Sequence, residues 1–319
     1  AHTLPLPNGI WVYTFYVGGA EDAEANDRTD ADQVWDPAHP PLLYDDQASD
    51  MFPNERRSAI YVPYDPVKQS LSANVSEEAP RTGENGTAFF AQVQPTDGKE
   101  TVFGVYLPHE YDASRADPYP ILVLIHGSHE VESTWFNQGA LIHILDNMIA
   151  EGRVEPTIVV TPNATDAEWN LPQLLSNVLD GILPYMETNY NAATDPRRRA
   201  YGGVSSGGLT TMYALFSRPH EFGYYLPMSA ALTEDCHPNY RAGGLKQAEI
   251  CFGFGWYDFS FSRCLEPQRP PGICARLQDI FEDLAGAGIP FTSHAAFGGH
   301  TWSTWRQNIV YMLGNVLWR

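Results

Sequence analysis

Apolar residues follow two alternating patterns from about residue 87 to the C-terminus. Short apolar runs, several of them rich in β-branched side chains, predict strands at 89–93, 102–107, 121–125, 158–160, 199–204, 224–228, 250–254 and 291–296. Between most of these runs apolar residues recur every three or four positions, which predicts helices at 141–149, 174–186, 209–216, 280–287 and 305–317. Alternation of strand and helix predicts an α/β fold with a doubly wound, mostly parallel sheet covered by helices on both faces.

Residues 1–85 do not follow this pattern. They contain an apolar segment at 10–17, an acidic stretch at 21–36 and a possible strand at 59–62. We therefore expect an irregular N-terminal extension that packs on, or leads into, an α/β domain at 86–319. The acidic stretch lacks the glycine and the terminal glutamate of an EF-hand calcium loop, so it favours a solvated loop.

The charge of the chain excludes some classes of partner. With 39 acidic and 19 basic side chains among 319 residues, the formal net charge is −20. Such a chain is repelled by phosphate backbones and anionic lipids, so we expect neither nucleic acid nor a membrane as partner. No apolar run reaches the length of about 18 residues that spans a bilayer. The composition makes no prediction of oligomeric state.

Several features predict a secreted, extracellular protein. The chain begins at Ala1 without a methionine, as a processed mature chain would. N-glycosylation sequons begin at Asn74, Asn85 and Asn163. An even number of cysteines, as disulfides require, lies in one short segment: Cys236, Cys251, Cys264 and Cys274. We expect a local bridge between the last two and, with it, one between the first two; four reduced thiols are the alternative.

The segment Gly203–Gly207, Gly-Val-Ser-Ser-Gly, matches the G-x-S-x-G pattern between a predicted strand and a predicted helix. A serine at such a turn needs a strained backbone, and glycines on either side remove side chains that would clash. Ser205 is the predicted nucleophile, because Val204 stands where Ser206 would need its upstream glycine. The backbone N–H of Ser206, at the start of the helix, is predicted to bind an oxyanion.

A serine nucleophile needs a base, and the base needs an acid partner. His300 follows the last predicted strand in a Gly-Gly-His loop, and we expect it to be the base. Asp258 follows the strand at 250–254 and is the predicted acid. Glu234 and Asp235, after the preceding strand, are the alternative acids.

A second oxyanion donor is expected in the loop after the strand at 121–125. The backbone N–H of Ser128 is the first candidate and that of Gly127 the second. His126 and His129 in the same loop could be half of a metal site, but no carboxylate or cysteine is placed to complete it, so we predict no metal.

The region from about Val102 to the C-terminus resembles the esterase-D, feruloyl esterase and antigen-85 group of α/β-hydrolases. The matching segments are Val105–Pro108 before Tyr111, Ile121–Gly127 with Trp135, Gly203–Gly208, Gly255–Phe259, and Gly298–Trp302 with Trp305 and Arg306. The resemblance implies the α/β-hydrolase fold, a triad of Ser205, Asp258 and His300, and an oxyanion hole formed by the amides of Ser128 and Ser206. The sequence departs from the group at Ser206, which replaces a commoner methionine, in the insertion around 264–274, and at 1–85.

The resemblance implies a carboxylic ester hydrolase. Together with the features above, we expect a secreted serine carboxylesterase, and we predict no cofactor. Its expected substrates are small-molecule or polysaccharide-linked esters, such as feruloyl or acetyl groups on plant polysaccharide. Tryptophan faces stack on sugar and phenolic rings, and the candidates for such a wall are Trp135, Trp169, Trp256 and Trp302. An acyltransferase of the antigen-85 type with the same triad, or a non-hydrolytic protein that retains the fold, is the alternative.

Overall fold

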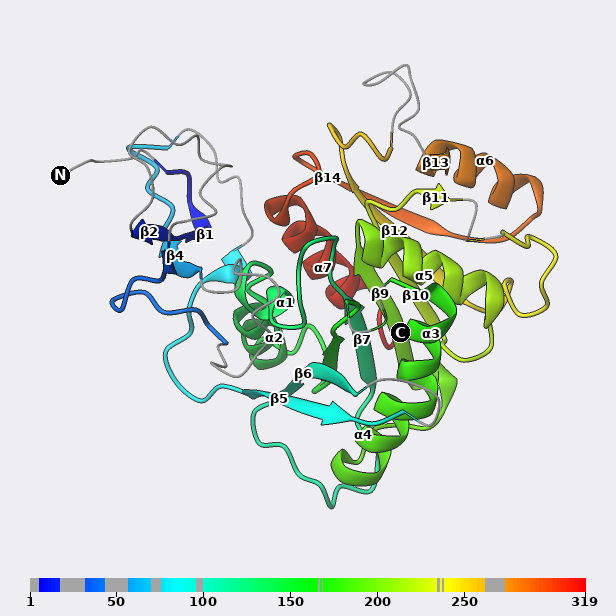
Figure 1. The fold of residues 1–319 in the computed structure, drawn as a ribbon, viewed down its shortest axis with the longest axis horizontal. Helices are drawn as coiled ribbons and strands as arrows, with labels where there is room; N and C mark the ends of the chain where they lie inside the picture. Colours follow the sequence, from blue (N-terminus) through cyan, green and yellow to red (C-terminus); the bar gives the residue numbers. More distant parts are fainter. Residues whose placement is uncertain are drawn as a thin grey trace.

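A sheet of eight strands forms the centre of the molecule (Figure 1). The structure is a computed structural model that describes residues 6–17, 32–43, 57–69, 76–95, 100–165, 167, 169–233, 236, 238–261 and 273–319. The strands of this sheet are, in spatial order, β14 (Thr292–Ala296), β12 (Glu249–Gly255), β10 (Tyr224–Met228), β9 (Arg199–Val204), β7 (Ile121–Ile125), β8 (Ile158–Pro162), β6 (Thr101–Leu107) and β5 (Thr87–Val93). Strands β14 to β8 run parallel, whereas β6 and β5 pair antiparallel. The predicted mostly parallel sheet is confirmed.

Helices cover both faces of the sheet, as predicted. One face packs against α3 (Leu171–Ser176), α5 (Ser206–Ser217) and α6 (Leu277–Gly286), and the other against α1 (Thr134–Asn137), α2 (Leu141–Ala150) and α7 (Trp302–Asn315). The predicted helix at 174–186 is α3 continued through a π-helical turn, Asn177–Ile182, into α4 (Leu183–Tyr190).

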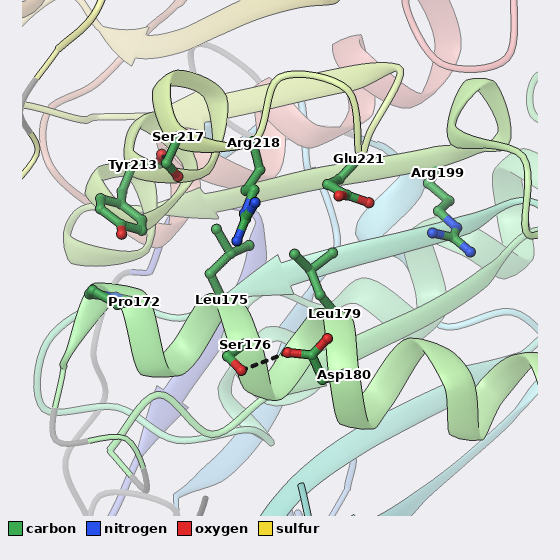
Figure 2. Close-up of a pocket in the computed structure, with 10 residues that line it drawn as sticks. All are labelled: Pro172, Leu175, Ser176, Leu179, Asp180, Arg199, Tyr213, Ser217, Arg218 and Glu221. Atoms are coloured by element: carbon green, nitrogen blue, oxygen red, sulfur yellow. Dashed lines mark hydrogen bonds between the residues drawn. The ribbon is translucent and has the colours of Figure 1, made fainter. Parts of the chain in front are cut away.

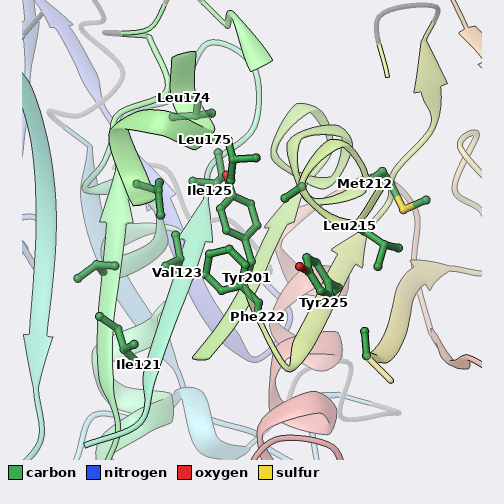
Figure 3. Close-up of a cluster of buried hydrophobic side chains, with 14 of the residues drawn as sticks. Ile121, Val123, Ile125, Leu174, Leu175, Tyr201, Met212, Leu215, Phe222 and Tyr225 are labelled. Atoms are coloured by element: carbon green, nitrogen blue, oxygen red, sulfur yellow. The ribbon is translucent and has the colours of Figure 1, made fainter. Parts of the chain in front are cut away.

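Strand β7 shows why the core has two halves. All five of its residues are buried, and successive side chains of a strand point to opposite faces. Ile121, Val123 and Ile125 join the cluster against α3 and α5, which Figure 3 shows, while Leu122 and Leu124 join the cluster against α2 and α7. A continuous apolar run is therefore needed to fill both halves of the core.

The N-terminal region forms two small sheets outside the central one (Figure 1). Strand β1 (Gly9–Tyr13) pairs antiparallel with β4 (Ser58–Val62), and β2 (Phe15–Val17) pairs with β3 (Asp32–Val34). A short 3-10 helix, Ser76–Glu78, then packs beside α2, where Asn147 Nδ2 donates to the carbonyl oxygens of Glu77 and Ala79 at 2.9 Å each. Residues 21–31 of the acidic stretch lie outside the described residues, and the domain boundary at 85 stays a prediction.

Two expectations about secretion chemistry are wrong in the described residues. Cys236 and Cys251 are buried free thiols, and they belong to the core clusters on opposite faces of the sheet, so they cannot form the predicted bridge. Asn163 is 2% exposed and its side chain accepts hydrogen bonds from Thr165, which leaves no room for a glycan. Asn85 is exposed; Asn74 and Cys264 lie outside the described residues. No described helix has the length and hydropathy that crossing a membrane requires.

Candidate active site

Ser205 lies at the sharp turn between β9 and α5, at the carboxyl edge of the sheet. Its backbone has φ +56° and ψ −117°, a conformation that residues other than glycine rarely adopt. The Ser205 N–H donates to the carbonyl oxygen of Met228 at 2.9 Å, which holds the turn against the end of β10. A Cβ on Gly203 would lie 2.6 Å from the backbone of Gly207, and one on Gly207 would lie 2.3 Å from the carbonyl oxygen of Ile125. Both glycines are therefore required for the close approach of strand and helix.

The structure brings His300 and Asp258 to Ser205. His300 Nε2 lies 2.9 Å from Ser205 Oγ, and His300 Nδ1 lies 3.1 Å from Asp258 Oδ1. Because an ionised carboxylate only accepts hydrogen bonds, Nδ1 carries the proton and Nε2 is free to accept from the serine hydroxyl. Glu234 and Asp235, the alternative acids, lie outside the described residues.

Asp258 is fully buried at the end of β12 and accepts several hydrogen bonds besides that of His300. Ser229 Oγ donates to its Oδ2 at 2.5 Å, and Ser260 donates to its Oδ1 through N at 2.9 Å and Oγ at 2.7 Å. Burial raises the pKa of Asp258, but the hydrogen bond and charge of His300 and the donors from the two serines together hold that pKa below its usual value. The carboxylate is thus kept ionised beside the imidazole.

The two predicted oxyanion donors come from different elements: Ser128 from the loop after β7 and Ser206 from the first turn of α5. Ser128 and Ser206 lie side by side, since their Oγ atoms share a hydrogen bond. Within the described residues neither backbone N–H of this pair has an acceptor in the chain. The N–H of Gly127 is instead engaged, because it donates to Glu130 Oε2 at 2.7 Å. Of the two predicted donors in this loop, Ser128 is therefore the one still available.

His126 holds the base of the same loop. It is fully buried, its Nδ1 lies 2.7 Å from the carbonyl oxygen of Gly127, and its Nε2 lies 3.0 Å from the amide nitrogen of Ala164. Burial lowers the pKa of His126 to about 4, so the ring is neutral, with Nδ1 donating and Nε2 accepting. Both ring nitrogens are occupied. Within the described ranges no three or more His, Cys, Asp or Glu side chains are grouped so that they could hold a metal ion.

The four predicted tryptophans have different environments. Trp135 is 0% exposed and donates through Nε1 to the carbonyl oxygen of Ile125, so its assignment to a substrate wall is wrong. Trp169 is half-buried with its ring edge-on to His126, and Trp302 is half-buried with Nε1 donating to Glu130 Oε1 at 2.8 Å. Trp256 is 58% exposed. For these last three, contact with substrate stays a prediction.

Four residues to which the sequence patterns assign no role support or border the site. Ser229 donates to Asp258, and Glu130 accepts from both Gly127 and Trp302. Phe259 packs its ring 4.5 Å from that of His300, and the exposed ring of Tyr257 contacts Phe297. Ser229 and Glu130 belong to no motif, whereas Tyr257 and Phe259 lie in the matching segment Gly255–Phe259, in which only Asp258 and Trp256 were assigned a role.

A second pocket, away from Ser205, has no serine–histidine pair among its lining residues. It lies between α3, the π-helical turn and the C-terminal end of α5, and Arg199, Asp180, Arg218 and Glu221 are among its lining residues (Figure 2). Ser205 is at the other end of α5, about 12 Å along the helix axis from Tyr213, the α5 residue of the lining that lies nearest to it in sequence.

Comparisons with known proteins assign the chain to a family. The family model Esterase, described as "Putative esterase", matches residues 95–316. The chain belongs to this esterase family. A relative of this esterase, the endo-1,4-beta-xylanase/feruloyl esterase of Xylanibacter ruminicola, is 28% identical over 67% of the chain, and the matched region spans 29% of that relative's length.

Solved structures share the fold of this esterase. A ferulic acid esterase from Anaeromyces mucronatus superposes with a TM-score of 0.61 at 18% identity, over 75% of this chain and 94% of that one. A feruloyl esterase module from Clostridium thermocellum, complexed with sinapinate, superposes with a TM-score of 0.55 at 23% identity, over 75% of this chain and 89% of that one. The α/β-hydrolase fold is thereby established for this esterase.

Proposed function

We propose that this esterase hydrolyses carboxylic esters through an acyl-enzyme formed on Ser205. Ser205 Oγ attacks the ester carbonyl and passes its proton to His300 Nε2, which then protonates the leaving alcohol. Asp258 orients the imidazole and stabilises its positive charge. The amides of Ser128 and Ser206 bind the oxyanion, and water activated by His300 releases the acid.

The observation that supports this proposal best is the continuous hydrogen-bonded series from Ser205 Oγ through His300 to Asp258 Oδ1, with distances of 2.9 and 3.1 Å. Such distances allow proton transfer from a hydroxyl to imidazole without rearrangement. The strained backbone of Ser205 supports the same role, because strain at a non-glycine residue persists where function requires it.

For the natural substrate we propose feruloyl or acetyl esters attached to plant polysaccharide. The named activity of the Xylanibacter relative and the sinapinate bound by the Clostridium module support an aromatic acid. The exposed rings of Trp256 and Tyr257 near Asp258 supply surfaces on which sugar or phenolic rings stack. Because such polymers lie outside cells, we also propose that the protein is secreted.

The replacement Ser205→Ala tests the mechanism. It should lower kcat for methyl ferulate and p-nitrophenyl acetate by about 10⁴-fold or more while thermal unfolding remains cooperative. Ser217→Ala, at the far end of α5, is the matched control. Unchanged hydrolysis in the Ser205 variant, or failure of a fluorophosphonate to label Ser205 in the wild type, would refute the proposal. Comparing acetylated xylan, methyl ferulate and feruloylated oligosaccharides then ranks the substrate classes.

A further inference from the structure

We infer that Glu130 is a positioning residue that fixes the oxyanion loop relative to the helix following His300. This inference rests on the proposed function. One carboxylate oxygen, Oε2, accepts the N–H of Gly127 at 2.7 Å, and the other, Oε1, accepts the indole N–H of Trp302 at 2.8 Å. The two donors are separated by 175 positions in the chain but meet at one side chain.

On the oxyanion side, the bond to Glu130 sets the direction of the Gly127 peptide. A Cβ on Gly127 would lie 3.1 Å from Glu130 Oε2 and 3.6 Å from Ser205 Cβ, so this peptide packs directly beside the nucleophile. With the Gly127 N–H engaged by the carboxylate, the Ser128 N–H is the next amide of the loop without a backbone acceptor in the described residues, and the Ser128 hydroxyl bonds that of Ser206. Glu130 thereby decides which amide of the loop faces the oxyanion.

On the histidine side, Trp302 begins α7 two residues after His300. Its ring packs edge-on against Trp305 with centroids 5.1 Å apart, and Trp305 packs edge-on against His300 at the same distance. Trp305 Nε1 also donates to Ser229 Oγ at 2.7 Å, and Ser229 donates to Asp258. A shift of Trp302 is therefore transmitted through contacts to both the base and the acid.

A carboxylate suits this position better than any other side chain of its size. Two N–H donors point at it, and each carboxylate oxygen accepts one of them. Glutamine has a single acceptor oxygen, and its NH₂ group would face the remaining donor. Glu130→Gln therefore loses one of the two bonds and introduces a donor opposite a donor, while it preserves the size of the side chain.

The experiment is a double-mutant cycle with Glu130→Gln, Trp302→Phe and the double variant, and Glu84→Gln as an exposed control. Each single variant should lower kcat for methyl ferulate by about 10- to 100-fold with KM nearly unchanged, because displaced catalytic groups lose transition-state stabilisation. Because the two replacements act on one hydrogen-bonded unit, their effects should not add: the double variant should be slower than the wild type by less than the product of the two single-variant factors.

A second readout separates positioning from general loss of structure. A phenylboronic acid forms a bond from boron to Ser205 Oγ, the hydroxyl proton passes to His300, and the tetrahedral adduct places a boron-bound oxygen in the oxyanion hole. Its affinity should fall by the same factor as kcat/KM, whereas the melting temperature should change little. Unchanged kcat in Glu130→Gln, or additive losses in the double variant, would overturn the inference. A wild type without ester hydrolysis would instead refute the proposed function.

Discussion

Two adjacent residues of α7, Trp305 and Arg306, connect this helix to two different regions of the molecule. Trp305, 5% exposed, donates to Ser229 beneath Asp258 and packs against His300. Arg306, 4% exposed, faces the N-terminal region, where its Nε lies 2.9 Å from Glu78 Oε1. Glu78 in turn accepts the N–H of Ile10 in β1 at 2.9 Å.

The difference lies in the kind of interaction. At the catalytic edge, Trp305 makes a neutral hydrogen bond whose loss costs about 1 kcal/mol. At the N-terminal region a fully buried ion pair joins two segments more than 220 positions apart, and removing one member leaves the other charge buried. Substitutions at the catalytic edge should therefore affect the rate of hydrolysis more than the free energy of unfolding. Substitutions at the ion pair should affect the free energy of unfolding more than the rate.

The largest effect is expected at the catalytic edge. Asp258→Asn preserves shape, and the hydroxyl of Ser229 can rotate to accept from the new amide, but the negative charge beside His300 is lost. We expect kcat/KM for methyl ferulate to fall by about 10⁴-fold, with a melting temperature close to that of the wild type. Calorimetry beside the assay checks both. A strongly destabilised Asp258→Asn variant that retained activity would contradict the expectation that this edge affects rate more than stability.

Arg306→Met tests the other side of the comparison. It leaves the Glu78 carboxylate buried without its cation, so the free energy of unfolding should fall by about 3–5 kcal/mol in urea titrations. The matched control is Arg197→Met, which breaks the exposed pair with Asp195 and should cost about 1 kcal/mol or less. Partial recovery of stability in Arg306→Met/Glu78→Gln would show that the loss comes from the unpaired Glu78 charge. Equal losses in Arg306→Met and in Arg197→Met would contradict this explanation.

The pH dependence of stability should report on the oxyanion loop. His126 is neutral in the folded protein, with a pKa of about 4, whereas unfolded histidine titrates near 6.5. Below about pH 6.5 the unfolded state binds a proton that the folded state does not, so stability falls with decreasing pH, by up to about 3 kcal/mol near pH 4. The decline from pH 7 to 5 should be smaller in His126→Gln. Identical slopes in both proteins would exclude His126 as its source.

The smallest effect is expected from Trp305→Phe. Phenylalanine retains a ring beside His300 but cannot donate to Ser229, so kcat should fall by up to about tenfold and unfolding free energy by about 1 kcal/mol. Steady-state kinetics and urea titration on the same preparation give both numbers. A loss of stability as large as that of Arg306→Met would remove the distinction between the two sides of α7.

Local patterns were sufficient to predict the strands of the central sheet and the three residues of the candidate triad. Each of the three, Ser205, Asp258 and His300, follows a strand of one parallel sheet. The carboxyl ends of parallel strands lie at the same edge of a sheet, and this does not depend on the remaining segments of the chain. The elbow glycines could be predicted for the same reason, because the constraint acts within a few residues of Ser205.

What could not be predicted depends on contacts between distant segments. Nothing local indicates that Trp135 packs into the core, and Glu130 has no pattern that relates it to Trp302. The pairing of Cys236 with Cys251 was plausible from spacing, but spacing does not say on which face of a sheet a side chain lies. The extension at 1–85 is connected by individual polar contacts, such as the pair of Glu78 and Arg306, which leave no periodic trace in the sequence.

The two buried thiols provide one chemical probe for each half of the core. Cys236 belongs to the cluster against α5 and α6, and Cys251 to the cluster against α2 and α7. Burial raises the pKa of both thiols, that of Cys236 to about 12, so neither reacts with alkylating agents until its surroundings open. Pulsed alkylation followed by peptide mass mapping would therefore time the opening of each face of the sheet, using side chains that the chain already carries.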